Sequence, residues 1–196
     1  MPKSYTVVSD YHNTRLDRWF KQNVINVPHS LIEKIIKQNK IKNFGLSIYE
    51  KQDIIQDEFI NVIQVPGNIF NQEIISSDKL KIFNSNKGII HIRSVFIQGL
   101  LLMPPNLIPK KLNSVKKALL HFHNLAKDLN IEKSHLAILC INKIMPNAKI
   151  IIGIDNIEQL RNILEININK VSQSDLEEII NIGKKYSNKI WDPRNW

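Results

Sequence analysis

The segment NVIQVPGNIFNQ, residues 61–72, joins a run of apolar and β-branched residues to a turn rich in Pro, Gly and Asn. A short apolar run bounded by turn formers is typical of a strand buried on both faces of a parallel sheet. Similar runs occur at FGLSIY (44–49), GIIHIRSVF (88–96) and KIIIGI (149–154). We therefore expect four strands, at 44–49, 61–66, 88–96 and 149–154.

The stretches between and after these runs have the spacing of amphipathic helices. Helices are expected within EIISSDKLKIF (73–83), LNSVKKALLHFHNLAKDLN (112–130), residues 133–143, NIEQLRNILEI (156–166) and SQSDLEEIINIGKKY (172–186). Ser172, followed by Asp175 and Glu177, is typical of a capped helix start. Strands that alternate with helices indicate an α/β fold with a parallel sheet.

The first 43 residues differ from the rest in charge. They carry a net charge of +5, out of +9 for the whole chain of 196 residues. Two short amphipathic helices are expected there, at 14–23 and from Pro28 to about Lys40, each with an apolar stripe and a basic face. A concentrated positive charge favours an anionic partner such as nucleic acid, although lysines can also simply solvate a surface.

Other features bound the function. No window approaches 18 consecutive apolar residues and MPKSYTVVSD (1–10) lacks an apolar signal core, so we expect a cytoplasmic protein without a membrane partner. Cys140 is the one cysteine, and its apolar surroundings predict a buried small hydrophobe. No metal-ligand spacing is present; His121 and His123 flank Phe122 and point to different helix faces, which makes them a poor metal pair.

The N-terminal sequence resembles a known RNA-binding element. TRLDRWF (14–20) followed by PHSLIEKIIKQNKIKN (28–43) is similar to the opening of the alpha-L RNA-binding motif, found in a small-subunit ribosomal protein and in large-subunit pseudouridine synthases. The likeness covers about residues 5–43 and stops before the hairpin that completes the motif. It implies RNA as a possible partner, with phosphate contacts from Arg15, Arg18, Lys34, Lys37 and Lys40.

Residues 44–196 resemble the C-terminal half of aldo/keto reductases. FGLSIYEKQDI (44–54) looks like the fifth strand of the family's barrel with its following helix, and NVIQVPGNIFNQ like the sixth strand. IHIRSVFIQGLLLMPP (90–105) and KIIIGIDNIEQLRNIL (149–164) look like the seventh and eighth strands with their loops, and the tail WDPRNW is similar to bacterial members linked to polysaccharide synthesis. The implied fold is α/β, a partial TIM-type (βα) barrel made of strands five to eight, with domains at 1–43 and 44–196.

The resemblance implies an NADP-binding residue set at the carboxyl ends of the strands. Ser47 and Gln64 would meet the nicotinamide carboxamide, and Arg93 occupies the position of a ring-stacking aromatic residue. The loop that passes the pyrophosphate would include Ser94, Gln98 and Gly99. Gly153 would allow the backbone to approach a phosphate closely before the last barrel helix. Gln159 would reach the adenosine end. Ile163 departs from an asparagine common in the family. Each of these side chains could also serve structure alone.

The catalytic Asp, Tyr, Lys and His of aldo/keto reductases come from the first four strands, which the matched region lacks. The leading hypothesis is therefore an NADP-dependent oxidoreductase fragment that keeps cofactor-side residues, has no catalytic residues and is inactive alone. The alternatives are a basic RNA-binding module on an inert scaffold and a rearranged gene remnant. Four parallel strands would leave two open edges, so we expect a homodimer or a complementary half-barrel chain as a partner.

Overall fold

The structure is a computed structural model that describes residues 38, 43–56 and 60–196. The two helices and five RNA-contact residues expected within 1–43 lie outside the described residues. The strands are β1 (Gly45–Ser47), β2 (Val62–Pro66), β3 (Ile89–Arg93) and β4 (Lys149–Ile150). The α-helices are α3 (Asp78–Ser85), α4 (Lys116–Asp128), α5 (Lys133–Ile144), α6 (Ile157–Leu164) and α7 (Gln173–Lys185). Short 3₁₀ helices occupy Lys51–Asp53, Pro105–Leu107, Lys110–Val115, Lys189–Trp191 and Pro193–Asn195.

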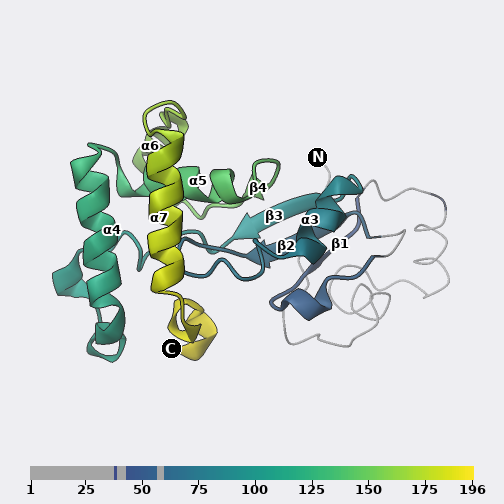
Figure 1. Cartoon of the computed structure of the whole chain (residues 1–196), viewed down its shortest axis with the longest axis horizontal. Coiled ribbons are helices and arrows are strands. Elements are labelled where there is room, and N and C mark those ends of the chain that lie inside the picture. The colour runs from purple at the N-terminus through teal and green to yellow at the C-terminus, as the bar shows by residue number, and fades with distance from the viewer. Residues whose placement is uncertain (1–37, 39–42, 57–59) are drawn as a thin grey trace.

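The strands form one parallel sheet in the order β1-β2-β3-β4, which confirms an α/β fold with a parallel sheet (Figure 1). Burial along β2 and β3 alternates strictly. Ile63, Val65, Ile90 and Ile92 are completely buried on one face, while the residues between them are half-buried. The expectation that both faces are buried is therefore wrong, because only one face contributes to the hydrophobic core.

All four expected strands are shorter in the structure: β1 spans Gly45–Ser47 instead of 44–49, β2 Val62–Pro66 instead of 61–66, and β3 Ile89–Arg93 instead of 88–96. β4 ends at Ile150 instead of residue 154, although the Ile151 N–H still donates to the Ile92 carbonyl at 2.8 Å. Beyond this bond the chain leaves the sheet toward α6. The helix expected after β1 is wrong in type: the described residues between β1 and β2 contain only the 3₁₀ turn at Lys51–Asp53.

Three of the described α-helices, α3, α6 and α7, begin with a side-chain cap that the sequence supplies. The Ser172 hydroxyl accepts the Asp175 N–H at 3.1 Å, which confirms the predicted cap of α7. Ser77 caps α3 and Asn156 caps α6 in the same way. Each cap satisfies a backbone N–H that lacks a partner within the helix, so these starts are fixed locally.

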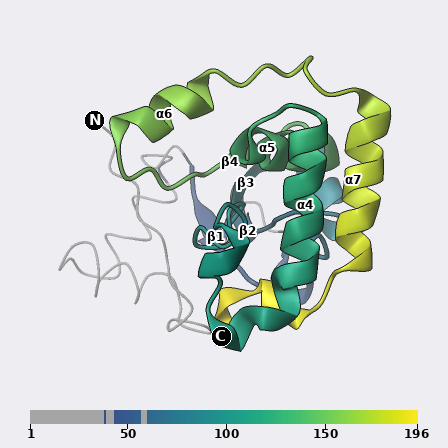
Figure 2. The same ribbon diagram turned by 90° about the vertical axis from the view of Figure 1, so that its left-hand side faces the viewer.

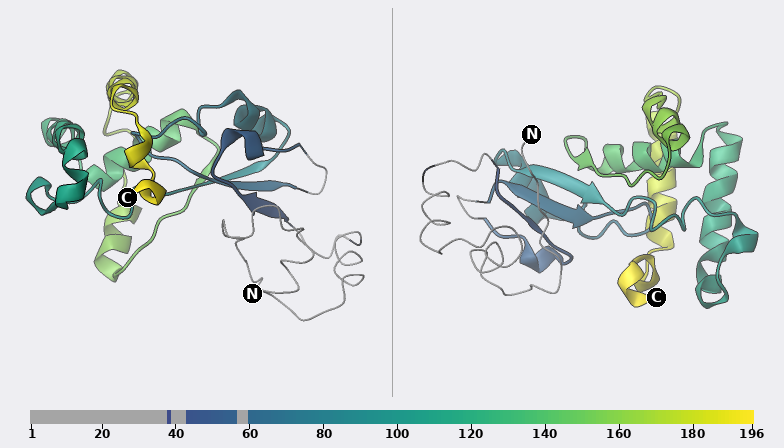
Figure 3. Two further views of the ribbon diagram at one scale, coloured as in Figure 1. Left: turned by 90° about the horizontal axis from the view of Figure 1, so that it is seen from below. Right: turned by 180° about the vertical axis from the view of Figure 1, so that it is seen from behind.

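The helices divide into two groups. α3 contacts β3, as in a βα unit, whereas α4, α5 and α7 pack mainly on one another. Figure 1 and Figure 3 show α4 and α7 beyond the ends of β2 and β3 to which the strand arrows point. Figure 2 shows α4 and α7 side by side from that end, with α6 farther away. The carboxyl edge of the sheet therefore faces the helices and the C-terminal tail.

One hydrophobic core joins the sheet, the helices and the tail. Phe70, in the turn after β2, stacks on Trp191 with ring centroids 4.2 Å apart and meets Phe122 of α4 edge-on. Gly183 of α7 allows a close approach, because an added Cβ would lie 2.2 Å from the Ile69 carbonyl oxygen. Cys140 is completely buried, as predicted, and burial raises the pKa of its thiol to about 12. Within the described residues, no helix is long and apolar enough to cross a bilayer.

Candidate functional site

A row of polar residues crosses the half-buried face of the sheet. The strand register places Ser47 beside Gln64, Gln64 beside His91 and His91 beside Lys149. In a parallel sheet, residues in register point to the same face, so the four side chains form one row. The Ser47 hydroxyl donates to Gln64 Oε1 at 3.2 Å. Two residues predicted to share a ligand are therefore in direct contact.

Two members of this row were not foreseen as site residues. The sequence places His91 within the predicted strand 88–96 and Lys149 at the start of the predicted strand 149–154, and neither is among the predicted site residues. Burial, and secondarily the charge of Lys149, lower the pKa of His91 below its ordinary value of 6.5. The imidazole is therefore neutral at physiological pH and able both to donate and to accept a hydrogen bond. The signal that could have found both residues is the register itself, which aligns Gln64, His91 and Lys149.

The carboxyl end of β3 carries a cation stacked on an aromatic ring. The guanidinium carbon of Arg93 lies 4.2 Å from the Tyr49 ring centroid, and that of Arg194 lies 4.0 Å from it. Two guanidinium groups cannot occupy one ring face at such distances, so the ring lies between them. Cation–π contacts of this kind contribute about 0.5–2 kcal/mol each, more as the groups are desolvated. The stack joins the segment after β1, the end of β3 and the C-terminal tail.

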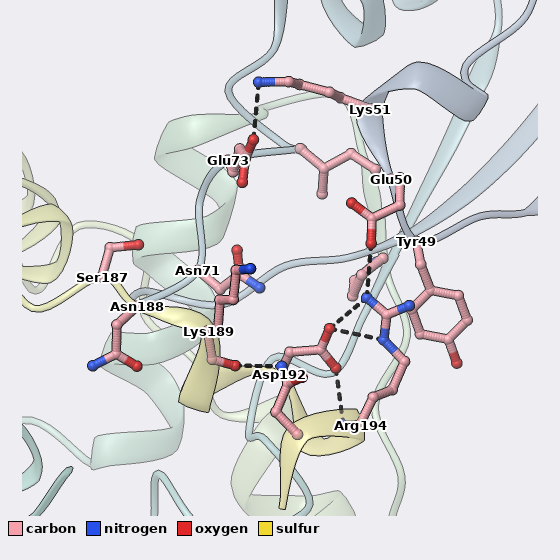
Figure 4. A pocket seen from close by; sticks show the side chains of 13 residues that line it. Tyr49, Glu50, Lys51, Asn71, Glu73, Ser187, Asn188, Lys189, Asp192 and Arg194 are labelled. Carbon is pink, nitrogen blue, oxygen red and sulfur yellow. Dashed lines mark hydrogen bonds and ion pairs between the residues drawn. The ribbon is translucent and has the colours of Figure 1, made fainter. Parts of the chain in front are cut away.

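Arg194 also forms the ion pairs that hold the tail. Its guanidinium donates to Asp192 Oδ2 from Nε at 2.8 Å and to Glu50 Oε1 from Nη2 at 3.1 Å, as Figure 4 shows. Burial opposes ionisation of Asp192, but its bonds to Arg194 outweigh burial and lower the pKa of that carboxyl. The same bonds raise the pKa of Arg194. The charge of Arg194 is thus paired with Asp192 inside the tail and with Glu50 outside it.

Two adjoining pockets open at this edge of the sheet. The larger has a volume of about 510 Å³ and is polar, and its walls include Asn71, Glu73, Asn188 and Lys189 (Figure 4). The smaller has a volume of about 200 Å³ and is lined by Arg93, Ser94 and Gln98 together with the tail and the turn after β2. Both pockets share walls from Tyr49, Pro66, Asn71, Asp192 and Arg194. Three predicted cofactor residues therefore meet in the smaller pocket.

The loop after β3 has an unusual backbone. Ser94, Ile97 and Gln98 adopt positive φ angles of 65°, 53° and 53°, and Gly99 has a φ of 84°. Only glycine adopts this conformation freely, and for a β-branched residue such as Ile97 it is a genuine outlier. Strain of this kind costs on the order of 1–3 kcal/mol per residue and occurs preferentially at binding sites. Complete burial of Ile97 holds the loop in place.

Five of the eight predicted cofactor residues line neither pocket: Ser47, Gln64, Gly99, Gly153 and Gln159. Gly153 lies between β4 and α6, and Gln159 lies in the first turn of α6. An added Cβ at Gly153 would meet nothing within 4 Å, so no described group approaches closely there. The Gln159 side-chain oxygen accepts the Asp155 N–H at 2.8 Å, which uses that side chain to support the helix start.

The described part of the chain contains no group of three His, Cys, Asp or Glu residues arranged to hold a metal ion. No protein-family model matches the sequence, and no curated protein matches it significantly. The arguments for function therefore come from the site. Its chemistry is that of binding: hydrogen-bond donors and acceptors on the sheet face, and cations with amides at the carboxyl edge.

Proposed function

We propose that residues 44–196 form an aldo/keto-reductase-like, nicotinamide-nucleotide-binding half barrel, related to strands five to eight of the TIM-type fold. The observation that carries the proposal is the contact between Ser47 and Gln64 in one register of two neighbouring parallel strands. Gln64 Oε1 accepts a hydrogen bond from the Ser47 hydroxyl, which leaves the Gln64 NH₂ free to donate and the serine oxygen free to accept. A carboxamide needs both a hydrogen-bond donor and an acceptor as partners, and the nicotinamide ring carries a carboxamide group.

The position of the pair supports this assignment. Ligands of parallel α/β proteins bind at the carboxyl ends of strands, and Ser47, which lies beside Gln64, is the last residue of β1. The two pockets open at the same edge of the sheet, but Ser47 and Gln64 line neither of them. Arg93, Ser94 and Gln98, which the family resemblance relates to the cofactor, line the smaller pocket. Gln159, which the resemblance assigns to the adenosine end, lines neither pocket and supports the start of α6, so we propose that NADP affinity resides mainly in the nicotinamide half of the site.

The chain is proposed to bind cofactor without turning it over. The Asp, Tyr, Lys and His that reduce carbonyl groups in aldo/keto reductases have no counterparts in the matched region. NADPH oxidation with aldehyde and ketone substrates should therefore stay at the background of the buffer. Turnover that copurifies with the chain through successive columns, and is lost in Gln64→Leu, would contradict this part of the proposal.

The binding test is a calorimetric or fluorescence titration of the full chain with NADPH. Trp191 lines the smaller pocket and serves as a fluorescent reporter. Gln64→Leu removes the amide donor and the hydrogen bond that orients Ser47, losses of about 1 kcal/mol each, and should weaken binding roughly tenfold to thirtyfold. Gln173→Leu, at an exposed position of α7, is the matched control and should leave affinity unchanged. Absence of saturable binding at millimolar NADPH would refute the proposal.

We also propose that a second copy of the chain covers the open side of the sheet near β4. Exposed apolar residues gather there: Ile151, Ile154, Leu160, Ile157 and Leu164, the last two 63% and 76% exposed. α6 buries none of its residues in the described structure although its apolar side chains recur at helical spacing. Size-exclusion chromatography with light scattering should give a dimer that Leu160→Glu with Leu164→Glu makes monomeric. A monomeric parent chain would favour a separately made half barrel instead.

A further inference from the structure

The guanidinium of Arg93 is the least compensated charge at the carboxyl edge of the sheet. It is half-buried, and among the described residues no carboxylate lies within 4.0 Å of it. Its Nη2 atom is buried and lacks a hydrogen-bond partner, while Nη1 makes one long bond of 3.4 Å to the Ser94 hydroxyl. Native proteins rarely leave a desolvated cation in this state unless a partner arrives from outside.

The nearest acidic residue cannot supply that partner. Asp192 lines the same pocket, but its carboxylate is already bound by the side chain and the backbone N–H of Arg194. Glu50, the other carboxylate of the cluster, is also paired with Arg194. The charges that line the smaller pocket therefore sum to a net positive value, with Arg93 left over.

The remaining walls suit an oxygen-rich anion. Ser94 and Gln98 contribute side-chain donors from one side, and Asn71 contributes an amide from the turn after β2. The amide of Asn68, in the same wall, already donates to the Trp191 carbonyl at 3.5 Å. Both faces of the Tyr49 ring are covered by guanidinium groups, so the pocket offers no free aromatic face for stacking a base. Its volume of about 200 Å³ is below the roughly 300–1,000 Å³ that is usual for drug-sized ligands.

We infer that the smaller pocket binds the oxyanion of a small ligand, a carboxylate or a phosphate group, through Arg93 with Ser94 and Gln98. Planar guanidinium groups match both anions in geometry, and hydrogen bonds between ions are about twice as strong as neutral ones. This inference does not depend on nicotinamide binding by Ser47 and Gln64. It rests on the proposed function only in that Arg93, Ser94 and Gln98 are also the residues that the family resemblance relates to the cofactor.

The test is calorimetry and thermal unfolding of the full chain with potassium phosphate and, separately, sodium malonate, at ionic strength held constant with chloride. Saturable binding of either anion, with a matching rise in melting temperature, is expected. Arg93→Gln should weaken binding about tenfold to a hundredfold, the value of one charge-assisted hydrogen bond. Arg161→Gln, at an exposed position of α6 outside both pockets, is the control and should bind normally.

A second variant keeps the test decisive if Arg93→Gln does not fold. Gln98 is exposed, so Gln98→Glu should preserve the fold while it places a negative charge beside the pocket and abolishes anion binding. Equal stabilisation by chloride, or unchanged binding in Gln98→Glu, would overturn the inference. Gln64→Leu should bind phosphate normally even where it loses NADPH, so failure of one proposal is separable from failure of the other. If phosphate and NADPH compete, the oxyanion that the pocket binds is part of the cofactor. If they bind independently, the oxyanion belongs to another ligand.

Discussion

The C-terminal tail should contribute more to stability than is usual for a chain terminus, and substitutions of Trp191 can test this prediction. Its indole is 1% exposed, stacks on Phe70 at 4.2 Å and donates from Nε1 to the Tyr186 carbonyl at 2.8 Å. Truncation of a buried tryptophan to alanine costs about 3–5 kcal/mol. Trp191→Phe keeps the stack but leaves the carbonyl unpaired, which costs about 1–3 kcal/mol.

Urea unfolding followed by circular dichroism measures both changes. With a denaturant dependence of about 2 kcal/mol/M, Trp191→Ala should lower the midpoint by roughly 2 M and Trp191→Phe by roughly 0.5–1.5 M. Trp196→Ala is the matched control, because Trp196 is only partly buried and should cost less than Trp191→Ala. A Trp191→Ala midpoint within 0.2 M or so of the parent value, given the uncertainty of such extrapolations, would refute the packing argument.

Three further outcomes follow from single contacts. Gly183→Ala should destabilise by about 1–3 kcal/mol in the same urea assay, because its Cβ would collide with the Ile69 carbonyl; an unchanged midpoint would show that α7 shifts freely. Bonds from Arg194 lower the pKa of Asp192 below its ordinary value of 3.8, so the ionised carboxyl stabilises the fold above pH 3.8, and this contribution is lost as the pH falls through the lowered pKa. Asp192→Asn should therefore lose less stability than the parent chain between pH 6 and 3, and a loss equal to that of the parent would contradict the pairing. Cys140, with its pKa raised to about 12 by burial, should react with a thiol reagent at pH 8 only as fast as the chain opens, and rapid labelling of folded protein would disprove its burial.

Local patterns were sufficient to predict much of the fold. Apolar runs between turn formers identified β2 and β3, and helical spacing with Ser172 at the cap identified α7. Such signals depend on neighbouring residues, so they can be read from the chain directly. The length of β4 could not, because residues 150–154 are apolar throughout and only pairing with Ile92 decides where the strand ends.

The candidate site was predicted in part for the same reason. Contact between Ser47 and Gln64 follows from their positions on adjacent parallel strands, and the family resemblance pointed to both. The roles of Tyr49 and Arg194 could not be foreseen, since the contact joins residues separated by most of the described chain. His91 and Lys149 acquire significance only through the strand register.

The tail explains why the cation at Arg93 is left without a carboxylate. Arg194 binds both Glu50 and Asp192, so a single arginine uses two negative charges that would otherwise face the pocket. If Arg194 were neutral, Asp192 would be free to approach Arg93, whose charge already helps to lower the pKa of that carboxyl. Arg194→Gln should therefore weaken phosphate binding without touching Arg93 itself, because an internal anion would then compete with the external one. Binding that strengthens in Arg194→Gln would mean that Asp192 does not reach Arg93, and that the two arginines act independently across the Tyr49 ring.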